Sequence, residues 1–344
     1  MKKLVIKKVE GKAFTMAYKL SLFHMGLGKR AFTMAEILLS LTIIGVVAAI
    51  TLPSLIGNIN ERTWNTQKKA LHARMAQALA LMPQLNGYGT FVASTTSNAG
   101  SDNTAQTFIT EGLSKVLKIT NVCTYDKLTD CGIASSYTTL SGSAKTVATD
   151  LLTFAPLFSD SYATASRVNE VSFNYNTKAA AFETQNGESI VLYYNPYCQD
   201  NKNVQPGYWD HAQQYMCANF VVDLNGAKGP NKVGQDISFI TAIYPNNPDV
   251  VAPDFLPAHG NDANNYTYDQ VNTICKNMGA EYRLPTLTEV MAMTYNRDLL
   301  GLLSLRFWSG SAVGSSHAWG VGLVYGTRSI SPRSETRAVR CVKR

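Results

Sequence analysis

An almost wholly apolar run from Phe32 to Leu52 constrains this chain more than any other feature, because its 21 residues contain a single ionisable side chain, Glu36. As an α-helix the run is roughly 31 Å long at about 1.5 Å per residue, which matches a hydrocarbon core of about 30 Å. The preceding residues 1–31 carry eight lysines and arginines against one acid, Glu10. Because cationic flanks are retained on the cytoplasmic side, we expect one membrane span with the rest of the chain outside the cytoplasm.

The net charge of +7 is confined to this basic leader. The other residues of the 344-residue chain contain equal numbers of basic and acidic side chains and are formally neutral. A protein that binds nucleic acid concentrates Lys and Arg on one face to neutralise phosphates. We therefore predict no nucleic-acid partner.

Six cysteines follow the apolar run, in the part of the chain that we place outside the cytoplasm, where disulfides form. None has the C-x-x-C spacing of a zinc or redox site. Sequence alone does not choose among their many pairings. Proximity favours three pairs: Cys123–Cys131, Cys198–Cys217 and, for the remaining two, Cys275–Cys341.

Glu36 lies in a segment where charge is costly. A carboxylate in hydrocarbon costs roughly 2.5–3.5 kcal/mol on insertion scales, so a carboxylate found there usually has a partner. A cut between Ala31 and Phe32 would place the new α-ammonium group of Phe32 one helical turn from Glu36, on the same face of the helix. The Glu36 carboxylate then has an oppositely charged partner, in its own chain or in a neighbouring one.

The residues around this position resemble the signal of type IV prepilins and pseudopilins, with Lys29-Arg30-Ala31 followed by Phe32-Thr33-Met34-Ala35-Glu36 and an apolar helix. The resemblance implies that a membrane peptidase cuts before Phe32, that Phe32 is then N-methylated, and that Glu36 directs assembly. Pro53 stands where helices of that family often carry a kinking proline. Ala31 departs from the family, which prefers glycine before the cut.

Two other interpretations of the apolar run compete with this one. An ordinary secretory signal would be cut after small residues such as Ala48 or Ala49, and the run would be discarded. A plain signal anchor would keep the run and give Glu36 no role. We favour the prepilin interpretation because it explains the register of both Glu36 and Pro53.

The helical period continues beyond Pro53, and Pro83 with Asn86-Gly87 marks the end of the helix. Apolar residues recur at steps of three and four in its second half: Leu71, Met75, Leu79 and Met82. Later the period changes to that of strands, which we expect at 171–175, 181–184, 189–194, 220–224 and 237–240. A long helix followed by antiparallel strands gives an α+β layer, which is the pilin layout.

The segment VVDLNGAKGPNKVGQDISF, residues 221–239, is similar to one found in many pseudopilin-like proteins, and the resemblance implies a loop between the last strands of the sheet. Asp223, Asn225 and Asp236 are candidate calcium ligands, because hard cations take clustered oxygens. The segment lacks the later acids and the closing glutamate of an EF-hand. We therefore favour a turn rich in Gly and Asn over a structural calcium site, and we expect no other cofactor.

Residues 262–344 contain the phrases YRLPTLTEV, RFWSGS, AWGVGLVYG and RAVRCV. We expect helices at 268–278 and 287–295, and strands at 307–311, 318–325 and 337–342. This order resembles the C-type-lectin-like modules at the ends of bacterial surface proteins. The EPN, QPD and WND triplets that hold calcium in sugar-binding lectins do not occur in this part of the chain, so calcium-dependent sugar binding does not follow.

Three aromatic residues of this part are candidates for ligand binding: Trp308, His317 and Trp319. Aromatic residues on strands are more often packing residues than ligand platforms. No Ser/His/Asp or HExxH arrangement stands out, so we expect no enzyme.

The expected organisation is a basic leader that is removed (1–31), a pilin-type helix (32–86, membrane part 32–52), a globular domain (87–245), a linker (246–261) and a lectin-like domain (262–344). We expect a minor structural subunit of a type IV pilus or type II secretion pseudopilus, held in the inner membrane before assembly. Its partners would be the prepilin peptidase and methyltransferase, other pilin or pseudopilin subunits, and the inner-membrane assembly machinery. The alternative is a pilus-tip or surface adhesin that binds a glycan or a protein through residues 262–344.

Overall fold

A computed structural model describes residues 33–85, 104–147, 179–194, 216–243, 249–255, 266–301, 305–323 and 327–343. The chain divides into two compact units, Met1–Gly57 and Asn58–Arg344. The predicted strand at 171–175 lies outside the described residues.

Helix α1, Met34–Leu85, is 52 residues long. Its first part, Met34–Thr51, has a mean hydropathy of 2.2, and none of it is buried. Among the described residues, α1 is the one helix long and apolar enough to cross a membrane. The prediction of a single long helix with an apolar first part is confirmed, and the helix continues through positions 53 and 83 to end at Leu85.

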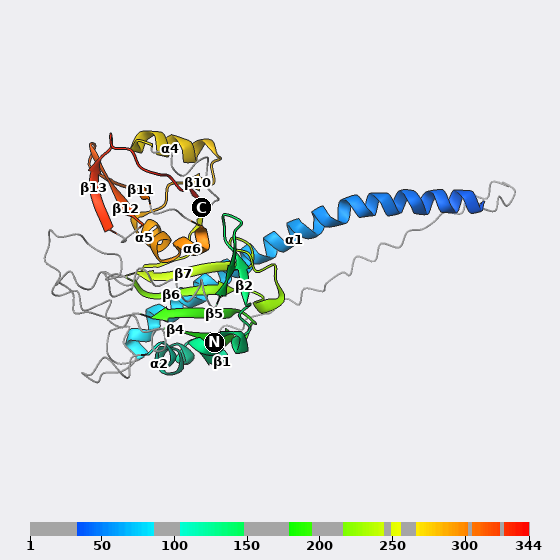
Figure 1. Ribbon diagram of the computed structural model, residues 1–344, viewed down its shortest axis with the longest axis horizontal. Coiled ribbons are helices and arrows are strands. Elements are labelled where there is room, and N and C mark those ends of the chain that lie inside the picture. The colour runs from blue at the N-terminus through cyan, green and yellow to red at the C-terminus, as the bar shows by residue number, and fades with distance from the viewer. Residues whose placement is uncertain are drawn as a thin grey trace, which may run out of the picture. The chain divides into compact units, whose positions relative to one another are not determined.

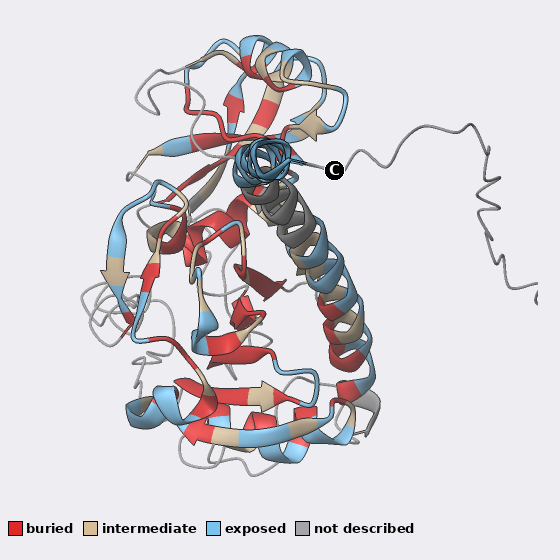
Figure 2. Cartoon of the chain, turned by 90° about the vertical axis from the view of Figure 1, so that its right-hand side faces the viewer, coloured by how far each residue is buried: buried red, intermediate tan, exposed pale blue. Residues whose placement is uncertain are grey.

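The second half of α1 is amphipathic and belongs to the larger unit. Leu71, Met75, Leu79 and Met82 are buried, and their spacing of three or four residues places them in one stripe. Figure 2 shows buried residues along this half of α1, whereas the first turns of the helix are exposed. The stripe predicted from the sequence is therefore the face by which α1 joins a core.

A six-stranded antiparallel sheet lies at the centre of the larger unit, in the order β1-β4-β5-β6-β7-β8 (Figure 1). Its strands are β1 Ile119–Thr124, β4 Ala179–Thr184, β5 Ser189–Tyr194, β6 Met216–Asp223, β7 Ile237–Ile243 and β8 Asp249–Val251. Every residue of β5 and β6 is buried, as expected of strands that are covered on both faces. The predictions of strands at 181–184, 189–194, 220–224 and 237–240, and of a loop between the last two, are confirmed.

One face of the sheet packs against α1. The buried stripe of α1 shares a core with Phe182, Leu192 and Phe220, which come from β4, β5 and β6. Three short helical turns add to this core: α2 Ala105–Thr107, a π-helical turn Phe108–Gly112 and a 3₁₀ turn Leu113–Lys115. Phe108 stacks on Tyr194 of β5 with ring centroids 4.3 Å apart, which joins these turns to the sheet.

The opposite face of the sheet carries the C-terminal part of the chain. Val290 of α5 (Leu287–Tyr295) and Phe307 of β11 (Arg306–Val313) belong to the same buried cluster as Val191 and Phe239 of the sheet. Asn219 of β6 donates a hydrogen bond to Asn296 Oδ1 at 3.0 Å, directly after α5. Residues 262–344 and the sheet therefore share a core within one compact unit.

The other elements of the C-terminal part form two small sheets, β11-β12-β13 and β10-β14-β9. Their bounds, with those of the remaining helices, are β9 Asp254–Phe255, α4 Tyr268–Asn277, β10 Tyr282–Arg283, α6 Arg297–Leu300, β12 His317–Gly322, β13 Thr327–Pro332 and β14 Val342–Lys343. Strands β8 and β9 fall inside the segment 246–261 that was expected to be a linker. The two predicted helices are confirmed.

The predicted strand at 337–342 is largely wrong. Only Val342 of that range is in β14, and Arg337 and Ala338 make single bridges to Tyr266 and Phe307. Because the segment pairs with different neighbours in turn, it cannot form one continuous ladder.

Between β1 and β4 lie a 3₁₀ segment, Tyr125–Cys131, and a hairpin of β2 Ser136–Thr138 with β3 Ala144–Thr146. Cys123 is bonded to Cys131 and Cys275 to Cys341, as predicted. Cys217 is also disulfide-bonded. Its expected partner, Cys198, lies outside the described residues.

Candidate functional site

The amino-terminal end of α1 is closed by a reciprocal pair of residues. Glu36 Oε2 accepts hydrogen bonds from the backbone N–H of Thr33 at 2.9 Å and from Thr33 Oγ1 at 3.0 Å. In return, Thr33 Oγ1 accepts a hydrogen bond from the Glu36 N–H at 3.3 Å. This is a capping box, in which two otherwise unsatisfied backbone donors of the first helical turn gain acceptors.

The capping box gives Glu36 a partner that the charge argument missed. The sequence signal was present, since Thr33-Met34-Ala35-Glu36 has the T-x-x-E spacing of such a box. Among the described residues, Thr33 is the only hydrogen-bond partner of the Glu36 side chain. Because Thr33 engages Oε2, the carboxylate can still accept hydrogen bonds from a donor outside the described residues.

The other residues predicted for processing and assembly are Ala31, Phe32 and Pro53. Ala31 and Phe32 lie outside the described residues, so the pairing of the Phe32 ammonium group with Glu36 stays a prediction. Pro53 is inside α1, with no break in the helix at its position.

A second candidate site is the β6–β7 loop, residues 224–236. Asp236 is fully buried, and its carboxylate accepts hydrogen bonds from the N–H groups of Asn231 and Lys232, each at 2.8 Å. Asp223 Oδ1 accepts one from the Asn225 N–H at 3.2 Å, and Asn225 Nδ2 donates to the Gly229 carbonyl at 2.7 Å. The three predicted calcium ligands thus hold the backbone of their own loop, as Asx turns do.

Burial raises the pKa of the Asp223 carboxyl from 3.8 to about 7. Backbone hydrogen bonds from Asn225 and Gly226 oppose this shift, whereas the charge of Asp236 adds to it. Asp223 therefore exchanges a proton near neutral pH.

Two amide oxygens of this loop, Asn225 Oδ1 and Asn231 Oδ1, are buried without a hydrogen-bond partner. Within the described part of the chain, no group of three His, Cys, Asp or Glu side chains is placed to hold a metal ion. A calcium ion at this loop, the alternative that the sequence disfavoured, stays a hypothesis.

Trp308, the first aromatic candidate, is a core residue. Its side chain is fully buried, and its indole N–H donates to the Tyr266 carbonyl at 2.9 Å. The Tyr268 ring meets it edge-on at 5.6 Å, and the Arg337 guanidinium lies 4.8 Å from the ring centroid. Because its side chain is fully buried and its indole N–H is engaged, Trp308 does not present a surface to a ligand.

His317 and Trp319 are both half-buried and lie on β12. Trp319 is paired across the strands with Ile330 of β13, whose side chain is 48% exposed. Directly opposed residues of an antiparallel pair project from the same face, so Trp319 and Ile330 form one apolar patch. The Arg328 guanidinium lies 5.8 Å from the Trp319 ring centroid.

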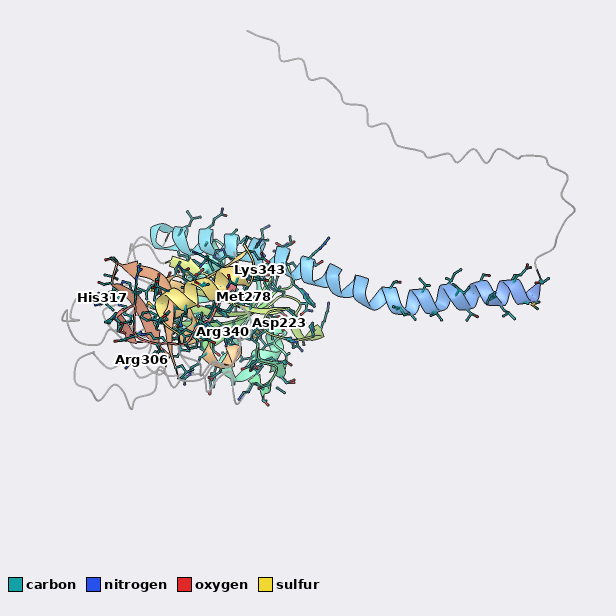
Figure 3. The ribbon with its side chains drawn as sticks, turned by 90° about the horizontal axis from the view of Figure 1, so that it is seen from above. Asp223, Met278, Arg306, His317, Arg340 and Lys343 are labelled. Carbon is teal, nitrogen blue, oxygen red and sulfur yellow. A yellow bond between two sulfur atoms is a disulfide. The ribbon has the colours of Figure 1, made fainter. Side chains whose placement is uncertain are left out.

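We call His317, Trp319, Arg328 and Ile330 the β12–β13 surface. Figure 3 shows that His317 and Asp223 lie at separate places on the larger unit, so this surface and the β6–β7 loop are two sites and not one.

The chain was also compared with known proteins. It matches no family model, and no curated protein is significantly similar to it.

Proposed function

We propose that the chain is a membrane-anchored structural subunit, cut before Phe32 and assembled with like subunits through α1 into a type IV pilus or a secretion pseudopilus. The observation that carries this proposal is the exposed apolar helix Met34–Thr51 with one carboxylate, Glu36, in its first turn. A helix of this length and composition is also typical of a signal sequence or a plain anchor. The position of Glu36 directly behind the expected cut supports the assembly role over both.

Assembly through α1 follows from the cost of leaving Glu36 unpaired in lipid. Such a carboxylate costs roughly 2.5–3.5 kcal/mol on insertion scales. The α-ammonium group of a neighbouring subunit's Phe32 would remove part of this cost only when the two helices are in register. The exposed apolar side chains, among them Ile37, Leu41 and Ile44, would then pack between helices in place of lipid.

The basic leader 1–31 supports the same orientation, because its cations would remain on the cytoplasmic side until processing. The disulfides Cys123–Cys131 and Cys275–Cys341 agree with an extracytoplasmic position for the larger unit, since such bonds persist in oxidising compartments.

An intact-mass measurement on the membrane-extracted protein tests the processing step. A mature chain that begins with N-methylated Phe32 is the expected result. A chain that retains residues 1–31, or one that begins near Ala49, would exclude processing as a prepilin.

A second function, a binding module at a filament tip or cell surface, is favoured by the β12–β13 surface. A half-buried tryptophan beside an exposed isoleucine leaves an apolar patch on one face of β12 and β13. Loss of cell or partner binding on Trp319→Ala, with filament assembly unchanged, would support this function. Equal loss of assembly would instead point to a contact between subunits.

A further inference from the structure

A cavity of about 410 Å³ lies within the larger unit, between the second half of α1 and the β7–β8 edge of the sheet. Its volume is in the range of small-molecule sites in proteins. Neither the capping box of α1 nor the β12–β13 surface contributes to it. Figure 3 places Lys343, one of its lining residues, well away from His317.

The walls of the cavity are mostly hydrocarbon. Leu71 of α1, Phe239 and Ile240 of β7, Val250 of β8 and Phe255 of β9 all line it. The Phe239 and Phe255 rings stack with centroids 6.1 Å apart and form one aromatic wall. A ligand that fills this cavity must therefore present apolar surface to it.

The charged groups of the lining are strongly unbalanced. Lys68, Lys69, Arg283 and Lys343 line the cavity, and Glu289 is the one acid among the described lining residues. The charge of Arg283 is neutralised by Glu289, because the two side chains make two parallel hydrogen bonds of 2.7 Å. Burial raises the pKa of Glu289, but the hydrogen bonds from Arg283 and Thr286 outweigh burial, and the pKa of Glu289 lies below its ordinary value. Glu289 therefore stays ionised, and its negative charge is balanced by Arg283 and not by the lysines.

Lys69 and Lys343 are exposed and pair with no carboxylate of the described residues. Lys68 donates a hydrogen bond to the Gly234 carbonyl at 2.9 Å, so we count only Lys69 and Lys343 as free positive charge. The basic groups come from α1 and β14, which are far apart in the sequence, and both elements contribute residues to the lining of this cavity. They supply positive charge beside an apolar interior.

Three other polar side chains of the lining, His72, Arg283 and Glu289, are already engaged. His72 Nε2 is hydrogen-bonded to the Val250 carbonyl at 2.9 Å, and the Arg283–Glu289 pair is closed on itself. A sugar or a nucleotide needs several directional partners, which these groups no longer offer. A ligand with one anionic group and an apolar body can bind to the lysines and the apolar walls that remain available.

From this combination we propose that the cavity binds a medium-chain fatty acid, with its carboxylate at Lys69 and Lys343 and its hydrocarbon tail against Phe239, Phe255 and Leu71. This site does not depend on processing or assembly, so an experiment can support or refute it without bearing on the proposed function.

The test uses the full chain in lipid nanodiscs and a dodecanoic acid that carries a diazirine at its methyl end. After illumination, peptide mapping by mass spectrometry locates the adducts. The expected result is labelling of residues 65–72, 238–240 or 250–255, which unlabelled dodecanoic acid suppresses. Labelling of residues 34–51 reports the probe dissolved in the bilayer and serves as an internal reference.

Three variants and one neutral probe sharpen the test. Lys69→Gln combined with Lys343→Gln should lower cavity labelling about fivefold relative to the bilayer reference, given the usual strength of exposed charge pairs. The control Lys127→Gln combined with Lys276→Gln removes two exposed lysines that do not line the cavity and should change nothing. Ala252→Trp, at an exposed lining position, should block labelling by filling space. The diazirine alcohol of the same length should label the cavity at least severalfold less than the acid.

Labelling confined to residues 34–51 would overturn the proposal. So would equal cavity labelling by the acid and the alcohol, or an unchanged signal in the Lys69→Gln and Lys343→Gln variant. Suppression by a peptide with a free carboxyl end but not by dodecanoic acid would also overturn it, in favour of a peptide site.

Discussion

Glu36 and Thr33 each accept a hydrogen bond from the backbone N–H of the other, at 2.9 Å and 3.3 Å, at the first turn of a helix otherwise fit for a membrane. Glu36 therefore has two separable attributes, a capping oxygen and a negative charge. A role in helix initiation needs only the oxygen, whereas a role in pairing with a neighbour's ammonium group needs the charge.

Substitutions can separate these two attributes. We expect Glu36→Ala and Glu36→Gln both to insert into the membrane but to be incorporated poorly into filaments, because both lack the negative charge. Glutamine keeps the capping oxygen, so its defect would report the charge alone. Thr33→Ala should be incorporated almost normally, since it removes the cap at a cost of about 1 kcal/mol and keeps the charge. Cell fractionation and the subunit content of sheared filaments measure the two properties. Normal incorporation of Glu36→Gln would refute the charge role and leave capping as the function of Glu36.

The raised pKa of Asp223 predicts a stability that depends on pH. In the native state Asp223 holds its proton up to a pH of about 7, whereas in the unfolded chain it loses the proton near 3.8. Between these values the native state binds more protons, so the contribution of Asp223 to stability falls as pH rises through this window and is constant above it. The full shift corresponds to roughly 4 kcal/mol as an upper bound.

Asp223→Asn should remove this dependence. Relative to the unmodified chain, we expect the variant to gain stability as pH rises, with a larger advantage at pH 8 than at pH 5, as judged by the urea midpoint of tryptophan fluorescence. A difference that is the same at both pH values would show that Asp223 titrates at its ordinary pKa.

The two described disulfides differ in how much chain they close. Cys275–Cys341 spans 66 positions and Cys123–Cys131 spans 8. In the chain-entropy account a longer loop removes more freedom from the unfolded state, by about 2 kcal/mol for these two lengths. Replacing Cys275 and Cys341 by alanine should therefore lower the free energy of unfolding more than replacing Cys123 and Cys131. Denaturant unfolding of both double variants compares them, and an equal or reversed order would contradict the entropic explanation.

The sequence predicted the elements whose signals are local. The apolar period of α1, the strands β4 to β7 and the two C-terminal helices follow from residue spacing that any short window contains. Thr286 and Glu289 form a capping box at the start of α5, as Thr33 and Glu36 do for α1, and both have the T-x-x-E signature. Boundaries of this kind can be read directly from the chain.

The contacts between distant segments could not be predicted in this way. Nothing near Asn219 in the sequence indicates that it meets Asn296, or that Val290 would share a core with Val191 of β5. The sharing of one core by the sheet and residues 262–344 depends on such pairs. The strand expected at 337–342 failed for the same reason, because its partners change from Tyr266 to Phe307 along its length.

Trp308 and Trp319 look alike in the sequence, one at each of two neighbouring strands, but their burial separates them. Trp308→Ala should cost about 3–5 kcal/mol of stability, because it empties a fully buried site and leaves the Tyr266 carbonyl without the indole donor. Trp319→Ala should change stability by less than about 1 kcal/mol, since its side chain is half-buried at the surface. Thermal unfolding followed by circular dichroism compares the two variants. A larger loss for Trp319→Ala would show that the β12–β13 surface is a structural contact, and it would remove that surface as a candidate for binding a partner.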